Sequence, residues 1–323
     1  MKRVLILALN FTFLIGSSHV NTIDNKNNGK SKTIIQQIKI LSKSTKWRLV
    51  DSIELNFRTY HPQGMVKIGK YFYISSVETI AKPEKFEIPE GGYDRTPGEG
   101  IGHLFKFNQK GNLISQITLG AGIIYHPGGI DYDGKYIWVA VAEYRPNSRS
   151  IIYRVDPVSL EAVKMFRFND HIGGIIHNTH SHTLHGISWG SRRFYTWKLD
   201  QSIGALNLGE MTEYEVPEYG MKLNGNHYID YQDCHYIVDQ YMLCCGLNKY
   251  TILKLGQIAF GGLDLVDLDL QVAIHQIPID RWVKQDLVMS NNPFYFEMHE
   301  NHIRFYFMPE DDKSKLYIYD AIN

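Results

Sequence analysis

A short alternating pattern recurs along the chain and constrains its fold more than any other feature. Apolar and aromatic residues alternate with polar ones and end in Asp, Asn or Gly at residues 104–108, 152–156, 196–200, 252–256 and 316–320. The copies end at residues 108, 156, 200, 256 and 320, so subtraction gives intervals of 48, 44, 56 and 64 residues. This spacing is typical of the four-stranded blades of a β-propeller with loop insertions.

Hairpin patterns precede these copies. Gly64–Ile74 matches Gly129–Val139, and both contain two alternating runs joined at a Gly-Lys turn. Outer strands are expected at residues 113–119, 162–168, 211–216 and 271–277. Trp47–Asn56 reads as a strand without partners of its own, which can close the ring by pairing with the last blade.

We therefore predict an all-β fold, a five-bladed β-propeller over residues 46–323 closed by an N-terminal strand. The alternative is a six-bladed ring with an unrecognised blade in residues 256–291. Within that stretch, the alternation of Asp264 to Asp269 favours an exposed strand face over a calcium loop.

The N-terminus has the order of a secretory signal. Lys2 and Arg3 precede an apolar run from Val4 to Ile15, and small residues follow. Residues 1–18 are predicted to be a signal peptide and residues 19–45 a flexible polar segment, of which Lys32–Ser44 can form a short helix. The expected location is secreted or periplasmic, with no transmembrane segment after signal cleavage.

Composition excludes some functions. The 34 basic and 34 acidic residues cancel, which argues against a nucleic-acid partner, because such a protein needs a basic excess. Only 3 cysteines occur, Cys234, Cys244 and Cys245, so at most one disulfide is possible. Stability must come from packing.

Three histidines occupy the same position of the repeat, just before the first strand of a blade. They are His61, His126 and His171, and blades four and five carry His227 and Asn292 in that region. Because equivalent positions meet around a propeller axis, these imidazoles are candidate ligands of one divalent metal ion or candidate acid–base groups. Alternatively, each histidine only caps the turn into its strand.

Charged and aromatic residues are expected on the same face. Glu78, Glu143, Arg145 and Arg192 are candidate catalytic residues, unless they are solvated charges of the rim. Tyr60, Tyr125, Tyr144, His227 and Asn292 are candidate substrate-binding residues. A long insertion, residues 79–100, can fold over this face.

A second group of histidines lies in one enlarged turn, at positions 177, 180, 182 and 185. The number of histidines in so short a segment suggests a metal site. Alternatively, the segment is an ordinary polar loop.

Two segments carry a family resemblance. Residues 126–134 (HPGGIDYDG) and 185–193 (HGISWGSRR) resemble a family of secreted, propeller-like proteins known only as a domain of unknown function. The likeness extends from about Trp47 to the C-terminus. More distantly, the chain is similar to the gluconolactonase and strictosidine-synthase-like propellers. The lactonase relationship implies an axial divalent cation held by carboxylates and amides, but the rim histidines depart from that pattern, so those ligands do not transfer.

Two functions follow as hypotheses. The first is an exported, metal-dependent hydrolase or lyase that acts on a small molecule through His61, His126 and His171. The second is a metal-free propeller that binds a small-molecule ligand or a protein partner through the same face. Fold alone does not decide between them.

Overall fold

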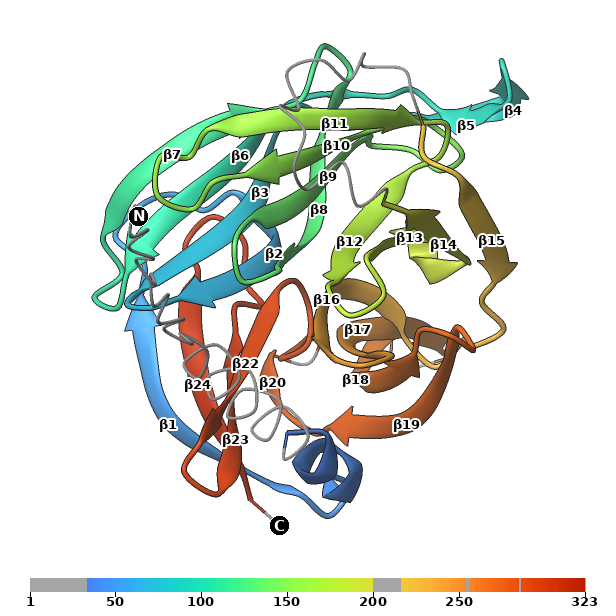
Figure 1. The fold of residues 1–323 in the computed structure, drawn as a ribbon. Coiled ribbons are helices and arrows are strands. Elements are labelled where there is room, and N and C mark those ends of the chain that lie inside the picture. The colour runs from blue at the N-terminus through green and yellow to red at the C-terminus, as the bar shows by residue number, and fades with distance from the viewer. Residues whose placement is uncertain (1–33, 200–215, 254–255, 285, 323) are drawn as a thin grey trace, which may run out of the picture.

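The computed structural model describes residues 34–199, 216–253, 256–284 and 286–322. The chain has an all-β, propeller-like fold in which four-stranded groups surround a common centre (Figure 1). In the described part of the chain, sheet pairing gives three sheets of four strands, one of eight and two of two. The eight-stranded sheet consists of two four-stranded groups joined by one parallel pairing, Gly174 with Gly129.

Each group runs from an inner to an outer strand in chain order. The first contains β2 (His61–Ile68), β3 (Tyr71–Ala81), β6 (Glu99–Asn108) and β7 (Leu113–Leu119). The second contains β8 (Ile124–Tyr132), β9 (Ile137–Glu143), β10 (Ser150–Val155) and β11 (Ala162–Phe168). The third contains β12 (Ile172–Asn178), β13 (Thr183–Ser188), β14 (Arg193–Lys198) and β15 (Tyr219–Leu223). The fourth contains β16 (Asp230–Val238), β17 (Tyr241–Ile252), β18 (Gly256–Asp267) and β19 (Val272–Ile279).

The last group combines both ends of the described chain. It contains β22 (Phe294–His299), β23 (His302–Phe307) and β24 (Lys315–Ile322), with β1 (Lys46–Glu54) at its outer edge. β1 pairs antiparallel with β24, with Trp47 opposite Ala321, as expected from the sequence. Trp47 is buried, and its ring centre lies 5.2 Å from that of Phe305. Aromatic packing therefore holds the N-terminal strand in place.

Two hairpins lie outside these groups. β4 (Lys85–Glu90) and β5 (Tyr93–Arg95) form one within the 79–100 insertion. β20 (Trp282–Lys284) and β21 (Leu287–Val288) form the other. The stretch 256–291, where the sequence left room for a sixth blade, thus holds β18, β19 and this small hairpin.

Three sequence expectations need correction. In the fourth copy of the alternating pattern, residues 252–256, Ile252 ends β17 and Gly256 begins β18, and the third strand of that group is Gly256–Asp267. Asp264 in that strand is buried and not on an exposed face. In the third group the outer strand is β15, and residues 211–215 of the strand expected there lie outside the described residues.

Part of the segment expected to be flexible is packed. Residues 34–40 are helical, and Ile35, Ile38 and Leu41 are buried in a cluster with Trp47 and Phe305. Apolar burial of about 1.5–3 kcal/mol for each such side chain explains why the helix stays against the sheets. No helix among the described residues has the length and apolar character needed to cross a bilayer.

The inner strands meet at a centre that we call the hub. There the fully buried carboxylate of Asp233 on β16 accepts hydrogen bonds from the backbone N–H groups of Met65 on β2 and Ile130 on β8, over 2.9 and 3.1 Å. His235 on β16 contacts Asp131 on β8 and the backbone carbonyl of Phe294 on β22. Polar side chains thus fix the inner strands relative to one another, which positions any site built on their ends.

Candidate functional site

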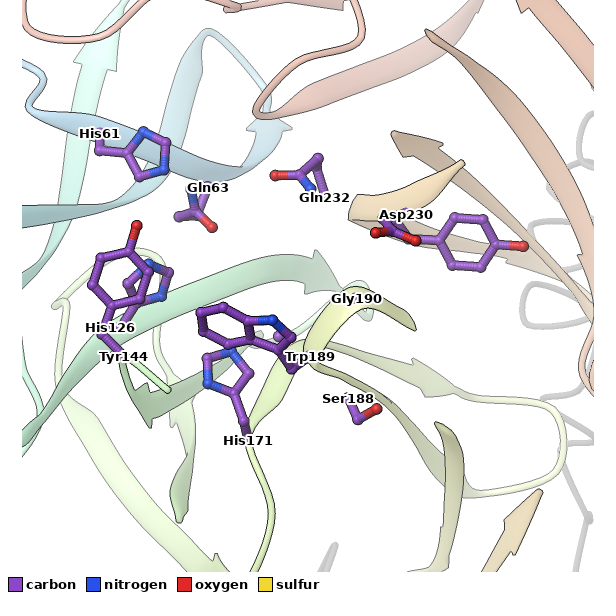
Figure 2. Close-up of a pocket in the computed structure, with 12 residues that line it drawn as sticks. His61, Gln63, His126, Tyr144, His171, Ser188, Trp189, Gly190, Asp230 and Gln232 are labelled. Carbon is purple, nitrogen blue, oxygen red and sulfur yellow. The ribbon is translucent and has the colours of Figure 1, made fainter. Parts of the chain in front are cut away.

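A cavity of about 240 Å³ lies among the starts of the inner strands, and we call it the hub pocket (Figure 2). Its lining comes from four of the strand groups and combines imidazoles, aromatic rings, amides and one carboxylate. The lining residues are His61, Gln63, His126, Tyr144, His171, Gly173, Ser188, Trp189, Gly190, Asp230, Tyr231 and Gln232.

The three repeat-related histidines all line this pocket. The ring centre of His126 lies 6.4 Å from that of His61 and 5.9 Å from that of His171. Their shared position in the repeat accounts for this, because each lies near the start of an inner strand: His61 opens β2, His126 is the third residue of β8, and His171 precedes β12. The structure therefore brings together the three residues that the sequence pattern predicted to converge.

Two of these imidazoles are oriented through Nδ1. His171 Nδ1 donates to the backbone carbonyl of Glu143 over 2.8 Å, and His61 Nδ1 donates to Asp311 Oδ1 over 2.8 Å. Since neither acceptor can donate, the bonding nitrogen carries a proton, and in the neutral form of each ring Nε2 keeps its lone pair. A histidine held in this way is ready to act as a metal ligand or a base.

His126 differs, because both of its ring nitrogens are buried and have no hydrogen-bond partner among the described residues. Burial and the neighbouring His171 and His61 place the pKa of His126 well below its ordinary value. Burial likewise lowers the pKa of His171 to about 4. At neutral pH both rings are uncharged. A buried polar group without a hydrogen-bond partner lowers the stability of the fold by about 1–3 kcal/mol. A contribution to stability therefore does not explain why a histidine stands at position 126.

Aromatic side chains form the walls. The Tyr144 ring centre lies 4.1 Å from that of His126, and the Trp189 ring centre lies 4.7 Å from that of His171. Burial, together with the charge of Asp311, raises the pKa of the Tyr144 hydroxyl, so it stays protonated.

Glu143 and Arg145 do not line the hub pocket. The fully buried Glu143 carboxylate contacts Arg145 at 2.6 Å and Arg149 at 2.7 Å. The Arg145 guanidinium also stacks on Tyr93, 3.4 Å from the ring centre. Glu143 contributes to the site through its backbone carbonyl, which accepts a hydrogen bond from His171 and so orients that ring.

Three more predicted residues are not among those that line the hub pocket. Glu78 contacts His103 at 3.2 Å, and Tyr60 stacks on the His103 ring with centres 5.1 Å apart. The Tyr125 hydroxyl donates to the Pro97 carbonyl, and burial raises its pKa to about 12. Tyr125 therefore fastens the 79–100 insertion to the second strand group.

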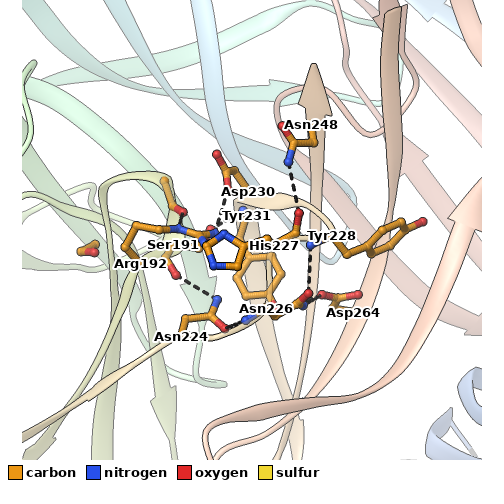
Figure 3. Close-up of polar contacts among 12 residues, drawn as sticks. Ser191, Arg192, Asn224, Asn226, His227, Tyr228, Asp230, Tyr231, Asn248 and Asp264 are labelled. Atoms are coloured by element: carbon orange, nitrogen blue, oxygen red, sulfur yellow. Dashed lines mark hydrogen bonds and ion pairs between the residues drawn. The ribbon is translucent and has the colours of Figure 1, made fainter. Parts of the chain in front are cut away.

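The other predicted residues support groups that do reach the pocket. Asn292 Nδ2 donates to Asp311 Oδ1 over 2.9 Å, and the same oxygen holds His61. Arg192 Nη2 donates to Asp230 Oδ1 over 2.8 Å, and Arg192 Nη1 donates to His227 Nδ1 over 2.6 Å (Figure 3).

Sequence reasoning missed Asp230, Gln63 and Gln232 in the lining and Asp311 behind His61. A signal was present for Asp230, which is the polar residue that opens an inner strand, as His61 does. Asp311 gave no signal, because it lies 250 residues from His61 in the sequence.

A second cavity, the outer pocket, shares His61, Tyr144 and Trp189 with the hub pocket and has a volume of about 400 Å³. Its remaining lining includes Lys82 and Arg95 of the 79–100 insertion. The insertion thus forms a wall of the approach to the hub, as its length suggested.

Metal-binding geometry is not preformed. Among the residues that the structure describes, no group of three or more His, Cys, Asp or Glu side chains is close enough to hold a metal ion as it stands. In the second histidine group, His177 pairs with Asp133 at 2.8 Å, and His185 bonds to Thr183 and Thr196. Those two histidines therefore have structural partners.

Solved structures with distant likeness include a luciferin-regenerating enzyme and an exo-1,5-alpha-L-arabinanase from a bovine ruminal metagenomic library. The first has 11% identity and a TM-score of 0.45, covering 84% of this chain and 95% of that one. The second has 10% identity and a TM-score of 0.46, covering 83% and 94%. At such TM-scores these likenesses do not bear on activity.

No curated protein matches the chain. The similarity to gluconolactonases and strictosidine synthases stays a prediction, whereas the resemblance to a family without assigned function is confirmed. Over residues 26–323 the chain matches, and belongs to, the family of unknown function DUF6454.

Proposed function

We propose that this protein is an exported five-bladed β-propeller whose hub pocket binds one divalent metal ion through His61, His126 and His171 and hydrolyses, or eliminates a group from, a small molecule. The observation that carries the proposal is the convergence of three imidazoles on one cavity, where His126 is buried and has no hydrogen-bond partner among the described residues.

Strand pairing supports the closed ring. Five groups of four strands surround the hub, and β1 adds to β24 so that the first and last parts of the described chain share one group. On the other side of the junction, Lys67 on β2 bonds to Glu297 on β22 over 2.5 Å, which joins the first and last inner strands.

The donor set fits a metal that prefers imidazole, such as zinc. His61 and His171 have Nδ1 partners of the kind that metal-binding histidines have, a carboxylate and a backbone carbonyl. The low pKa values of His126 and His171 keep those rings uncharged at neutral pH, so each ring retains one nitrogen lone pair.

One of the two measured ring separations is slightly long for a shared ion. Two imidazoles that share zinc through bonds of about 2.0–2.1 Å have ring centres roughly 5–6 Å apart, and the observed values are 5.9 and 6.4 Å. A small rotation of His126 would close this difference, and no hydrogen bond from a described residue opposes it.

When bound, a divalent ion at this place would polarise a carbonyl group or activate water. The chain's own groups would then bind and orient the substrate. Trp189 and Tyr144 form apolar walls, Gln63 and Gln232 offer amide groups, and the outer pocket extends the space for substrate. The outer pocket, at about 400 Å³, has the volume of a small-molecule site.

Export is supported by the pairing of Cys234 with Cys244 in a disulfide, since such bonds persist in oxidising compartments. Cys245 is buried and free. The predicted signal peptide, residues 1–18, lies outside the described residues. Secretion or periplasmic location is therefore part of the proposal.

A second candidate is a metal-free propeller that binds a small molecule at the hub. It is favoured by the finding that no metal-ligand set is preformed among the described residues. In this case His61, with Asp311 behind it, and the Tyr144 hydroxyl would only hydrogen-bond a ligand.

The test compares chelator-treated protein with protein reloaded with zinc, using δ-valerolactone and p-nitrophenyl acetate as probes. Zinc is expected to restore hydrolysis in the wild type and in His180→Ala, whose side chain is exposed outside the pocket. Zinc is not expected to restore hydrolysis in His171→Ala. Zinc-independent hydrolysis, or none, contradicts the metal-dependent proposal, and binding of probe without turnover favours the second candidate.

A further inference from the structure

Asp230 supplies the one carboxylate among the residues that line the hub pocket. It opens β16, on the side of the cavity away from the three histidines (Figure 2). Its side chain is 44% exposed, so it is neither a solvated surface group nor a sealed structural one. A carboxylate in this position faces whatever occupies the space between it and the imidazoles.

The neighbourhood fixes one carboxylate oxygen. Arg192 Nη2 donates to Oδ1 over 2.8 Å, and Arg192 is itself held by the Gly190 carbonyl and by His227 (Figure 3). No described residue donates to Oδ2. Gly190 lines the pocket, and a Cβ placed on it would lie 3.6 Å from Oδ2. Oδ2 therefore lies next to the lining of the cavity.

The surroundings also favour proton uptake by this group. Partial burial raises the pKa of Asp230, although the Arg192 and His227 side chains oppose the shift. Across the pocket His126 and His171 are uncharged at neutral pH and add little attraction. An acid–base group works best when its pKa moves from its ordinary value toward the working pH.

We infer that Asp230 is the acid–base residue of the hub pocket in the hydrolysis of a small molecule, and that Arg192 is its positioning residue. This inference rests on the proposed hydrolase function and assigns a catalytic role that the histidines do not fill.

With an ester or lactone as the probe, the protons of hydrolysis balance as follows. As the oxygen of water forms a bond to the carbonyl carbon, Oδ2 of Asp230 takes one proton from that water. When the tetrahedral adduct breaks its bond to the alkoxide oxygen, Asp230 returns the proton to the departing alkoxide. The products are an alcohol, or the hydroxyl end of an opened lactone, and an acid that releases the second water proton on ionising.

The first measurement is a ¹³C NMR titration of protein labelled at aspartate carboxyl carbons, with Asp230→Asn used to assign the signal. The expected midpoint is above the ordinary aspartate value of 3.8, and Arg192→Ala is expected to raise it further because a cation is lost. A midpoint at or below that value would mean a fixed ion pair and would overturn the inference.

The second measurement is the pH–rate profile of zinc-loaded protein on δ-valerolactone. Asp230→Asn is expected to lower kcat by about 10²–10⁴-fold with zinc content unchanged. Arg192→Ala is expected to move the acidic limb of the profile to higher pH. The matched control is Asp280→Asn, which alters an exposed aspartate paired with Arg281 at 2.9 Å outside the pocket.

The outcomes separate the two proposals. Zinc-dependent turnover that Asp230→Asn reduces less than threefold overturns the role of Asp230 and leaves the metal site standing. A wild type that neither binds zinc nor hydrolyses the probe overturns both.

Discussion

His171 Nδ1 donates a hydrogen bond of 2.8 Å to the backbone carbonyl of Glu143, so one ring nitrogen is committed and Nε2 faces the hub pocket with its lone pair. The bond joins the end of β9 to the residue before β12, and thus links two strand groups at the site. It also explains how a residue predicted to be catalytic, Glu143, contributes through its backbone.

The first prediction concerns the unpartnered imidazole. His126→Leu is expected to stabilise the metal-free protein by about 1–3 kcal/mol, because it removes two buried polar atoms that lack partners. The same change is expected to abolish zinc binding. Urea unfolding and zinc titration measure the two effects.

A matched control for that change is His185→Leu, in a buried histidine whose ring nitrogens bond to Thr183 and Thr196. This variant is expected to lose stability and to keep zinc binding. Loss of stability in His126→Leu as large as in His185→Leu would show that His126 is structural.

The second prediction concerns acid pH. In the unfolded chain His126 and His171 gain protons as the pH falls through 6.5, but in the folded chain His171 stays neutral down to about 4 and the pKa of His126 also lies well below 6.5. The unfolded state therefore binds more protons, and stability falls as the pH drops from about 6.5 to 4, by about 1.4 kcal/mol per pH unit for each histidine.

Urea unfolding at pH 7, 6 and 5 measures this slope. His126→Leu is expected to reduce it by the contribution of one proton. An identical slope in the variant and the wild type would show that His126 titrates normally in the folded protein.

The third prediction separates structure from catalysis at Glu143. Glu143→Gln leaves Arg145 and Arg149 without their buried carboxylate and is expected to cost about 3 kcal/mol in the free energy of unfolding. Zinc affinity is expected to change little, because the carbonyl that holds His171 remains. Unchanged stability with lost turnover would instead make Glu143 catalytic.

The fourth prediction concerns β1. The buried Asp320 on β24 contacts Arg48 on β1 and Arg304 on β23 at 2.9 and 2.8 Å. Burial opposes ionisation, but these guanidinium groups hold the pKa of Asp320 well below its usual range. Its stabilisation is therefore present above the ordinary value of 3.8 and is lost as the pH falls through the lower folded value.

Asp320→Asn is expected to cost about 3 kcal/mol at pH 7 and less near pH 3. Asp312→Asn, in the exposed pair with Arg58, is the control and is expected to cost less than about 1 kcal/mol. Equal effects of the two changes would show that Asp320 does not anchor β1.

The strands were predictable where short runs rich in apolar and β-branched residues lie between turn residues. Residues 113–119 and 162–168 were predicted as strands and are β7 and β11. In the fourth group the third strand was expected at residues 252–256, but it is Gly256–Asp267, and Asp264 within it was expected to be exposed. Asp264 is buried only because Tyr231 and Asn226, from other segments, donate to it.

The site was predictable only where the repeat places residues. His61, His126 and His171 converge because they share one repeat position. Asp230, Asp311 and the partners of Glu143 were not predictable in this way, because side-chain direction and contacts between distant segments decide which carboxylates face the pocket. A single sequence holds no direct record of those contacts.

The most direct test is equilibrium dialysis of the protein against zinc, followed by elemental analysis. The account predicts one zinc ion per chain in the wild type and less than about a tenth of that in His126→Ala/His171→Ala, with the variant still folded. A folded wild type that binds no zinc, or a double variant that binds as much as the wild type, would contradict it.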